Sequence, residues 1–390
     1  MNPTGPMNLA GPPKVAIIHN VPVSYKHLLF SRLAAMQLDF EVLFTARQSG
    51  RVISPVDLSG APYRYRILID GPFEKRSVIG SLRGAWKALD EIAPQVLIVS
   101  GWFDYSSWGG LLWAKRNRRP CILWAESNHF DFRRVFWKEM VKRAFVRQFQ
   151  AVHVYGTSNA EYLVRLGFDP NRIIFKRAVV DTELFVRALD YDTSPDKPLT
   201  LIYVGRLAPE KNLAILLRAL AIVKQKGGSA RVKLLIVGSG KLEADLKGMS
   251  KTLGLDGTVT FAGPVFGKPL VDLYSSAHVL ILPSKREQWG LVVLEGMCCG
   301  LPAIVSDQCG CCKDLVLPNT GWPISPFEEV GLARLLEQIA AMDRAVLKRM
   351  GQAGRSLAST YSAAACATIV AKSVSEVYSA SIARTAVAAG

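Results

Sequence analysis

Two cations in the second half of the sequence stand where they could bind a phosphorylated ligand. Arg206 and Lys211 directly follow the apolar run 200–205, which is typical of a β-strand, and a helical pattern begins after them. A strand followed by a loop and a helix brings cations and the first helical N–H groups to one sheet edge, which suits a diphosphate. The sequence therefore predicts a diphosphate cradle here. The alternative is a surface Arg and Lys at a helix start.

Two carboxylates lie further along the chain. Glu287 follows the apolar run 278–284, and Glu295 lies in a helical stretch that ends before Gly300. If this helix begins near Gln288, a rise of about 1.5 Å per residue separates the two carboxylates by about 12 Å along the axis. Acids so far apart cannot act on one atom. We expect Glu287 to contact a transferred group and Glu295 to accept hydrogen bonds from a diol such as a ribose.

The elements that must position these residues follow a regular order. Short apolar runs alternate with helix-length amphipathic segments, which indicates parallel sheets with crossover helices. Strands are expected at 14–20, 39–46, 64–70, 95–101, 120–127, 151–156 and 172–179, and then at 200–205, 233–238, 258–263, 278–283 and 302–306. Ligands of such sheets bind beyond the carboxyl ends of the strands. The predicted class is α/β, with two doubly wound Rossmann-like domains facing across a cleft.

The domain boundaries follow from changes in this pattern. We predict a disordered tail, a first domain that binds the acceptor, a polar linker, a second domain that binds the donor nucleotide, and a final helix that packs back on the first domain. The ranges are 1–13, 14–187, 188–199, 200–372 and 373–390, respectively.

The second domain resembles the retaining GT-B glycosyltransferases of family 4, the glycosyl transferases group 1. The resemblance lies in VGRLAPEKN, LLIVGSGKLEADL and PSKREQWGLVVLEGMCCGLPAIVSD, and Glu287 and Glu295 match the Glu-x7-Glu signature of that family. It implies a hexosyltransferase-type enzyme that moves a sugar from a UDP- or GDP-sugar with retention. Arg206 and Lys211 would hold the diphosphate, Glu287 the donor sugar and Glu295 the ribose, with Gly290, Leu291 and Val292 in the same donor site. No metal or other cofactor is expected, because the two cations can neutralise the leaving diphosphate.

The first domain departs from the family pattern at one position that matters for catalysis. Many members place a His at the end of a later strand of this domain, and the corresponding run 120–127 offers Glu126. Glu126 could bond a sugar hydroxyl or stabilise positive charge in an oxocarbenium-like transition state. The alternative is a structural ion pair with Arg133 or Arg134.

Weaker candidates for contacting the acceptor lie in two loops of the first domain. Tyr25, Lys26 and His27 follow the first strand, where many family members have glycines, and His129 follows the run 120–127. We expect a glycan or a lipid-linked acceptor, as in the synthesis of surface polysaccharides or glycolipids.

Charge, hydropathy and cysteine content indicate the cellular compartment of the protein. The 390 residues carry a formal charge of +16, which attracts anions such as nucleotides, acidic lipids or nucleic acid. No apolar run reaches the roughly 18 residues of a membrane span, and no signal peptide precedes the first strand. Five of the seven cysteines crowd between Cys298 and Cys312 and are expected to be packing residues. We therefore predict a cytoplasmic protein.

The stretch 132–149 combines apolar and basic residues at helical spacing. This pattern favours peripheral binding to the anionic inner face of a membrane, and an ordinary amphipathic helix is the alternative. Two further classes of function remain open. One is a sugar-nucleotide epimerase or a glycan synthase or phosphorylase of the same fold. The other is a basic protein that binds membranes or nucleic acid, although no nucleic-acid-binding signature is evident.

Overall fold

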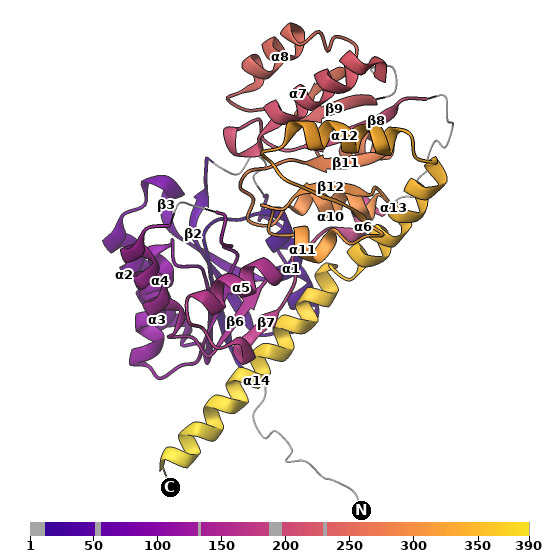
Figure 1. Ribbon diagram of the computed structural model, residues 1–390. Coiled ribbons are helices and arrows are strands. Elements are labelled where there is room, and N and C mark those ends of the chain that lie inside the picture. Colours follow the sequence, from indigo (N-terminus) through magenta and orange to yellow (C-terminus); the bar gives the residue numbers. More distant parts are fainter. Residues whose placement is uncertain (1–11, 51–55, 132–133, 187–196, 229–231, 390) are drawn as a thin grey trace, which may run out of the picture.

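Two parallel β-sheets, each flanked by helices, make up the part of the chain that the computed structural model describes (Figure 1). The described residues are 12–50, 56–131, 134–186, 197–228 and 232–389. Residues 1–11 of the predicted disordered tail and most of the predicted linker lie outside these residues.

The first sheet has seven strands in the order β3-β2-β1-β4-β5-β6-β7. All its neighbouring strands are parallel, with β1 inside the sheet and paired to both β2 and β4. Because helices cover both faces, the central strands are buried along their whole length and read in the sequence as apolar runs. The strands are β1 Val15–His19, β2 Phe40–Gln48, β3 Arg64–Pro72, β4 Val96–Ser100, β5 Cys121–Ala125, β6 Ala151–Val154 and β7 Ile173–Phe175.

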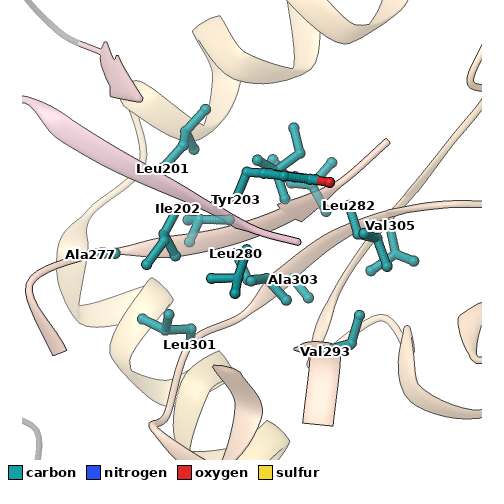
Figure 2. Close-up of a cluster of buried hydrophobic side chains, with 14 of the residues drawn as sticks. Leu201, Ile202, Tyr203, Ala277, Leu280, Leu282, Val293, Leu301, Ala303 and Val305 are labelled. Carbon is teal, nitrogen blue, oxygen red and sulfur yellow. The ribbon is translucent and has the colours of Figure 1, made fainter. Parts of the chain in front are cut away.

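The second sheet has six strands in the order β10-β9-β8-β11-β12-β13, again all parallel. Its core forms where β8, β11 and β12 pack against helix α10, as Figure 2 shows for Leu201, Leu280, Val293, Ala303 and Val305. The strands are β8 Leu199–Val204, β9 Val232–Val237, β10 Val259–Gly263, β11 Val279–Leu282, β12 Ala303–Ser306 and β13 Gly321–Ile324. Strand β13 has no counterpart among the predicted strands.

The helices follow the crossover pattern expected of doubly wound sheets. Several begin at a side chain that accepts a hydrogen bond from the first turn: Ser77 before α2, Asp104 before α3 and Asp343 before α13. The helices of the first domain are α1 Ser24–Ala35, α2 Val78–Ile92, α3 Tyr105–Arg116, α4 Phe136–Val146 and α5 Thr157–Arg165; those that follow are α6 Thr182–Phe185, α7 Leu213–Val223, α8 Glu243–Thr252, α9 Lys268–Ser275, α10 Leu291–Cys298, α11 Cys312–Leu315, α12 Glu329–Ala340, α13 Arg344–Ser359 and α14 Ala363–Ala389.

The chain crosses between the domains at one place in both directions. Val180, on the way to the second domain, forms a parallel bridge with Ser362 on the way back, and its N–H donates to Tyr361 O at 3.1 Å. Helix α14 then runs along the first domain against α1 (Figure 1). It begins at Ala363, ten residues before the predicted start at residue 373. The boundary was misplaced because Cys366 and Val370 already lie in the core of the first domain. Among the described residues, no helix is both long and apolar enough to cross a membrane.

Candidate active site

The loop after β8 carries both predicted cations at the carboxyl edge of the second sheet. Arg206 Nη2 lies 2.9 Å from Glu210 Oε1, and the Arg206 side chain is 43% exposed. The backbone oxygen of Arg206 accepts a hydrogen bond of 2.8 Å from the buried Tyr203 hydroxyl. This bond fixes the turn from the strand, so the guanidinium extends from a rigid base toward solvent.

Asn212 connects this loop to helix α7. Its backbone is left-handed, with φ 57°, a conformation that Asn tolerates better than most residues. The buried side-chain amide donates to Pro283 O at 3.2 Å and to Pro326 O at 2.8 Å. These bonds hold the N-terminus of α7 beside the segment that follows β11. The sheet edge therefore presents two cations and the first N–H groups of a helix, as the sequence predicted.

Lys211 and Glu287 form an ion pair that unites the two predicted motifs. Lys211 Nζ contacts Glu287 Oε2, and the side chains are only 14% and 18% exposed. The Glu287 backbone is held in turn by Cys309, through an isolated bridge, and by the Gly310 N–H, which donates to Glu287 O at 3.1 Å. Residues 76 positions apart in the sequence thus meet in one partly enclosed site.

Helix α10 begins at Leu291, so the predicted start near Gln288 is wrong. Gly290 precedes the helix with φ 107°, and a Cβ there would lie 3.0 Å from Leu282 and 3.2 Å from the Cys311 sulfur. Residues 288–290 are therefore not helical, and the predicted axial separation of about 12 Å between the carboxylates does not apply. Leu291 is half-buried in the first turn, as is Val292.

Glu295 lies on the second turn of α10. Its Oε2 accepts a hydrogen bond of 2.8 Å from the hydroxyl of Tyr274 on α9. Burial raises the pKa of Glu295 to about 6, although the bond from Tyr274 acts in the opposite direction. Tyr274 leaves acceptor sites on the carboxylate that hydroxyl donors of a ligand can fill.

Glu126 follows β5 and lies in a charged cluster of the first domain. Lys26 Nζ on α1 is 2.7 Å from Glu126 Oε1, and the Tyr155 hydroxyl donates to the same oxygen. Burial alone would raise the pKa of Glu126, but Lys26 and Lys176 lower it to about 2. The carboxylate is therefore ionised throughout the physiological range, and its side chain is 26% exposed.

A second lysine lies deeper in this cluster. Lys176 is 1% exposed, and its Nζ lies 4.2 Å from the centre of the Tyr155 ring. Burial and the neighbouring Lys26 lower the pKa of Lys176 to about 7. The cluster at the strand ends thus holds one ionised carboxylate, Glu126, against two buried lysines.

The predicted structural partners of Glu126 have other roles. Arg134 donates to the Tyr162 hydroxyl at 2.7 Å and lies 3.4 Å from Glu139. Arg133 lies outside the described residues. The alternative of an ion pair was thus right about the pairing but wrong about Arg134, because α1 supplies the cation as Lys26.

The structure places two of the four predicted acceptor residues, Tyr25 and Lys26, in the Glu126 cluster and the other two elsewhere. Tyr25 is half-buried beside the cluster, and burial together with Glu126 raises its pKa. Lys26 is 1% exposed, with its Nζ 4.3 Å from the centre of the Trp124 ring, so its side chain is packed within the domain. His27 Nδ1 lies 2.9 Å from the Tyr63 hydroxyl and away from Glu126. His129 lies in a separate pocket between α4 and α5.

The loop after β5 reaches the second domain, which sequence reasoning did not foresee. Asn128 Nδ2 donates to Glu287 O at 2.8 Å and to Gln288 O at 3.0 Å. Nearby, the rings of Tyr155 and Trp289 are 5.7 Å apart. The loop that carries Glu126 and the loop that carries Glu287 therefore meet at the boundary between the domains. In the sequence, the only sign of this contact is that Asn128 is a polar residue close to the end of a strand.

Helix α4 divides the aromatic stripe that was predicted over 132–149. Phe145 and Phe149 are buried in the core of the first domain. Phe136, Trp137, Met140 and Val141 are 47% to 81% exposed. A pocket of about 230 Å³ lies beside them, lined by His129, Arg134, Phe136, Glu139, Met140, Arg143, Tyr162, Arg165 and Leu166.

The side chains that commonly bind metal ions do not form a metal site within the described part of the chain. No group of three or more His, Cys, Asp or Glu side chains there could hold a metal ion. All seven cysteines are free and buried. The five between Cys298 and Cys312 pack in the core of the second domain, as expected from the sequence.

Comparison with known proteins places this geometry in context. Residues 191–357 match the family model described as glycosyl transferases group 1. The D-inositol 3-phosphate glycosyltransferase of Stackebrandtia nassauensis is 30% identical over 229 residues, which are 55% of this chain and 51% of that protein. For five curated relatives, this one included, the matched stretch spans 29% to 51% of the relative's own length.

Solved structures match over nearly the whole chain. Sucrose-phosphate synthase from Thermosynechococcus elongatus superposes with a TM-score of 0.77 at 22% identity, covering 94% of this chain and 99% of that one. HepE of Anabaena in complex with UDP gives a TM-score of 0.74 at 16% identity, covering 93% and 100%. At such identities the likeness establishes the GT-B fold.

Proposed function

We propose that this chain, in which residues 191–357 match the glycosyl transferases group 1 model and which has the GT-B fold, transfers a sugar from a nucleotide diphosphate sugar with retention of anomeric configuration. The observation that carries this proposal is the meeting of Lys211 with Glu287 beside Arg206 and the α7 N-terminus. Cations, helical N–H groups and a carboxylate at one sheet edge suit a diphosphate with its attached sugar.

In the proposed donor complex, Arg206 and Lys211 bind the diphosphate and Glu295 accepts hydrogen bonds from the ribose. Each cation already has a carboxylate partner, Glu210 or Glu287, so the bound diphosphate shares the cations with these groups. Gly290, Leu291 and Val292 border the same site. The donor is proposed to be a UDP- or GDP-sugar; HepE of Anabaena has been solved with UDP and with UDP-glucose.

The proposed reaction takes place on one face of the sugar. As the bond to the diphosphate breaks, positive charge develops at the anomeric carbon, and the ionised Glu126 stabilises it from the first domain. The departing phosphate oxygen accepts the proton of the attacking acceptor hydroxyl, so no separate base is needed. Glu287 holds the sugar while Arg206 and Lys211 take up the charge of the leaving group, a role that a metal ion fills in other enzymes.

A donor screen tests this proposal. UDP-glucose, other UDP-sugars and GDP-sugars are incubated with the protein, and release of the nucleoside diphosphate is measured with and without EDTA. We expect release from one donor class, unchanged by EDTA. Glu287→Gln should lower turnover at least about tenfold with donor affinity retained, whereas Glu295→Ala should weaken nucleotide binding. Conversion of the donor without release would indicate an epimerase, and loss of activity in EDTA would contradict the metal-independent reaction.

For the acceptor we propose a glycan or a lipid-linked molecule, with the protein bound peripherally to an anionic membrane surface. The support is the exposed apolar face of α4, flanked by Lys138 and Arg143. Apolar side chains beside cations suit the interface of an acidic bilayer. Vesicles of phosphatidylcholine with phosphatidylglycerol should bind the protein, and the double substitution Trp137→Ser with Met140→Ser should abolish binding. Equal binding to pure phosphatidylcholine, or no effect of the substitutions, would contradict the membrane proposal.

A further inference from the structure

The side chain of Asn128 forms a hydrogen-bonded clamp between the two domains. Its amide nitrogen donates to Glu287 O at 2.8 Å and to Gln288 O at 3.0 Å. Its amide oxygen accepts from the Phe130 N–H at 2.8 Å. An amide has two N–H hydrogens and one carbonyl oxygen, so all its groups are engaged and its orientation is fixed. The side chain is fully buried.

The second domain is shaped to receive this amide. Gly310 lies directly against it, and a Cβ at this position would be 2.9 Å from Asn128 Nδ2 and 1.9 Å from Gln288 O. The Gly310 N–H donates to the same Glu287 oxygen at 3.1 Å. Glu287 O thus accepts one hydrogen bond from its own domain and one from the other domain.

The clamp acts on the segment that carries the carboxylate of the proposed site. Glu287 pairs with Lys211 through its side chain while its backbone is held by Asn128. Glu126 lies two residues before Asn128 in the same loop, within about 7 Å along the chain. The amide of Asn128 therefore links the backbone of Glu287 directly to the loop that carries Glu126.

We propose that Asn128 is a positioning residue that aligns Glu287 with Glu126 when the domains are together. This inference rests on the proposed transfer reaction and adds a residue that touches neither donor nor acceptor. A misplacement of about 1 Å at a catalytic group can cost about a hundredfold in rate. Loss of the clamp should therefore lower turnover, while the donor cradle of Arg206, Lys211 and Glu295, which lies within the second domain, keeps its affinity.

The test compares Asn128→Ala, Asn128→Asp and the control Thr157→Val. Asp keeps the shape of Asn but brings a carboxylate oxygen against two carbonyl oxygens. Thr157→Val removes a different contact between the domains, the 2.7 Å hydrogen bond from Thr157 Oγ1 to Asp314. With UDP-glucose as donor, both Asn128 variants should lose about tenfold or more in kcat with KM changed less than threefold. The kcat and the KM of Thr157→Val should each stay within threefold of the wild-type value.

Hydrogen exchange tests the positioning role of Asn128 without a measurement of turnover. Peptides covering 285–290 should exchange at least about fivefold faster in Asn128→Ala than in the wild type, and at an unchanged rate in Thr157→Val. If wild-type protein releases no nucleoside diphosphate from any UDP- or GDP-sugar, the proposed reaction is in doubt, whereas the clamp is still judged by hydrogen exchange. Unchanged exchange in Asn128→Ala, or equal losses of kcat in Asn128→Ala and Thr157→Val, would overturn the positioning role.

Discussion

Glu295 combines a buried position with a role that requires negative charge. Its pKa is raised to about 6 by burial, so the carboxyl is largely protonated at pH 5 and largely ionised at pH 7. A raised carboxyl pKa means that the folded state binds more protons than the unfolded state between about 4.5 and about 6. Stability therefore falls as the pH rises through that interval. The affinity of the Glu295 carboxylate for the hydroxyl groups of a ligand should instead rise as the pH rises.

We predict that nucleotide affinity depends on the ionisation of Glu295. Between pH 7 and pH 5 the wild type should lose about tenfold more affinity for UDP than Glu295→Gln does, because only the wild type must lose a proton to bind. Calorimetric titration with UDP at each pH measures this difference, and the variant cancels the titration of UDP itself. Parallel pH profiles in both proteins would remove Glu295 from the ribose site.

At this scale the sequence indicated the positions of the candidate donor residues at strand ends but not their contacts with other elements. Arg206, Lys211 and Glu287 could be selected because each follows a strand, and strand ends of one parallel sheet lie together. The pairing of Lys26 with Glu126 and the bond from Asn128 to Glu287 could not be predicted, because the partners lie 100 and 159 positions apart. A contact of that range depends on how the elements pack, which local patterns do not encode.

Two helical glycines illustrate how packing between elements reverses a local preference. Gly351 is buried in α13, and a Cβ there would lie 1.7 Å from Gly300 O, at the end of α10. Gly248 is exposed in α8, and nothing lies within 4 Å of its Cβ position. Helix propensity alone favours Ala at both sites by up to about 1 kcal/mol.

The two substitutions should therefore have opposite effects. Gly248→Ala should raise the free energy of unfolding by about 0.5 to 1 kcal/mol, and Gly351→Ala should lower it by about 2 kcal/mol or more, because α13 must move away from α10. Urea denaturation of each variant against the wild type measures both values. A stabilised Gly351→Ala protein would mean that α13 is not held against α10 as described.

The predicted elements agree with the structure in type and order. The predictions are wrong where Gly or Pro residues interrupt the usual sequence pattern. Strand β13 contains Gly321 and Pro323, residues that disfavour a strand in the sequence pattern, but it lies at the edge of the sheet, where Pro is tolerated. The start of α10 was placed too early because the left-handed Gly290 interrupts a segment that is otherwise apolar and helix-compatible.

For the whole molecule, helix α14 joins the end of the chain to its first domain. Val370 and Val374 are fully buried in that domain, and Ser373 Oγ lies 2.7 Å from His153 Nε2. Further along the same helix, Val387 is 83% exposed. The apolar spacing predicted a helix here, but only the packed structure shows that the helix lying on the first domain begins at Ala363.

We expect two Val→Asp substitutions on this helix to differ sharply. Val374→Asp should cost more than about 3 kcal/mol, because it buries an unpaired carboxylate. Val387→Asp should change the free energy of unfolding by less than about 0.5 kcal/mol. Thermal unfolding of both variants provides the comparison. Similar melting temperatures for the two would contradict the packing of α14 on the first domain.

The double crossing at Val180 and Ser362 also determines when each domain can fold during synthesis. The second domain lies between the crossings, so all its strands and helices are made before α14 is. The first domain begins to emerge from the ribosome earlier, but its core includes Ala363 to Val374. It therefore stays incomplete, with apolar surface uncovered, until α14 has been translated. The domain synthesised first is the one completed last, and chains that terminate early would carry a finished second domain on an unfinished first one.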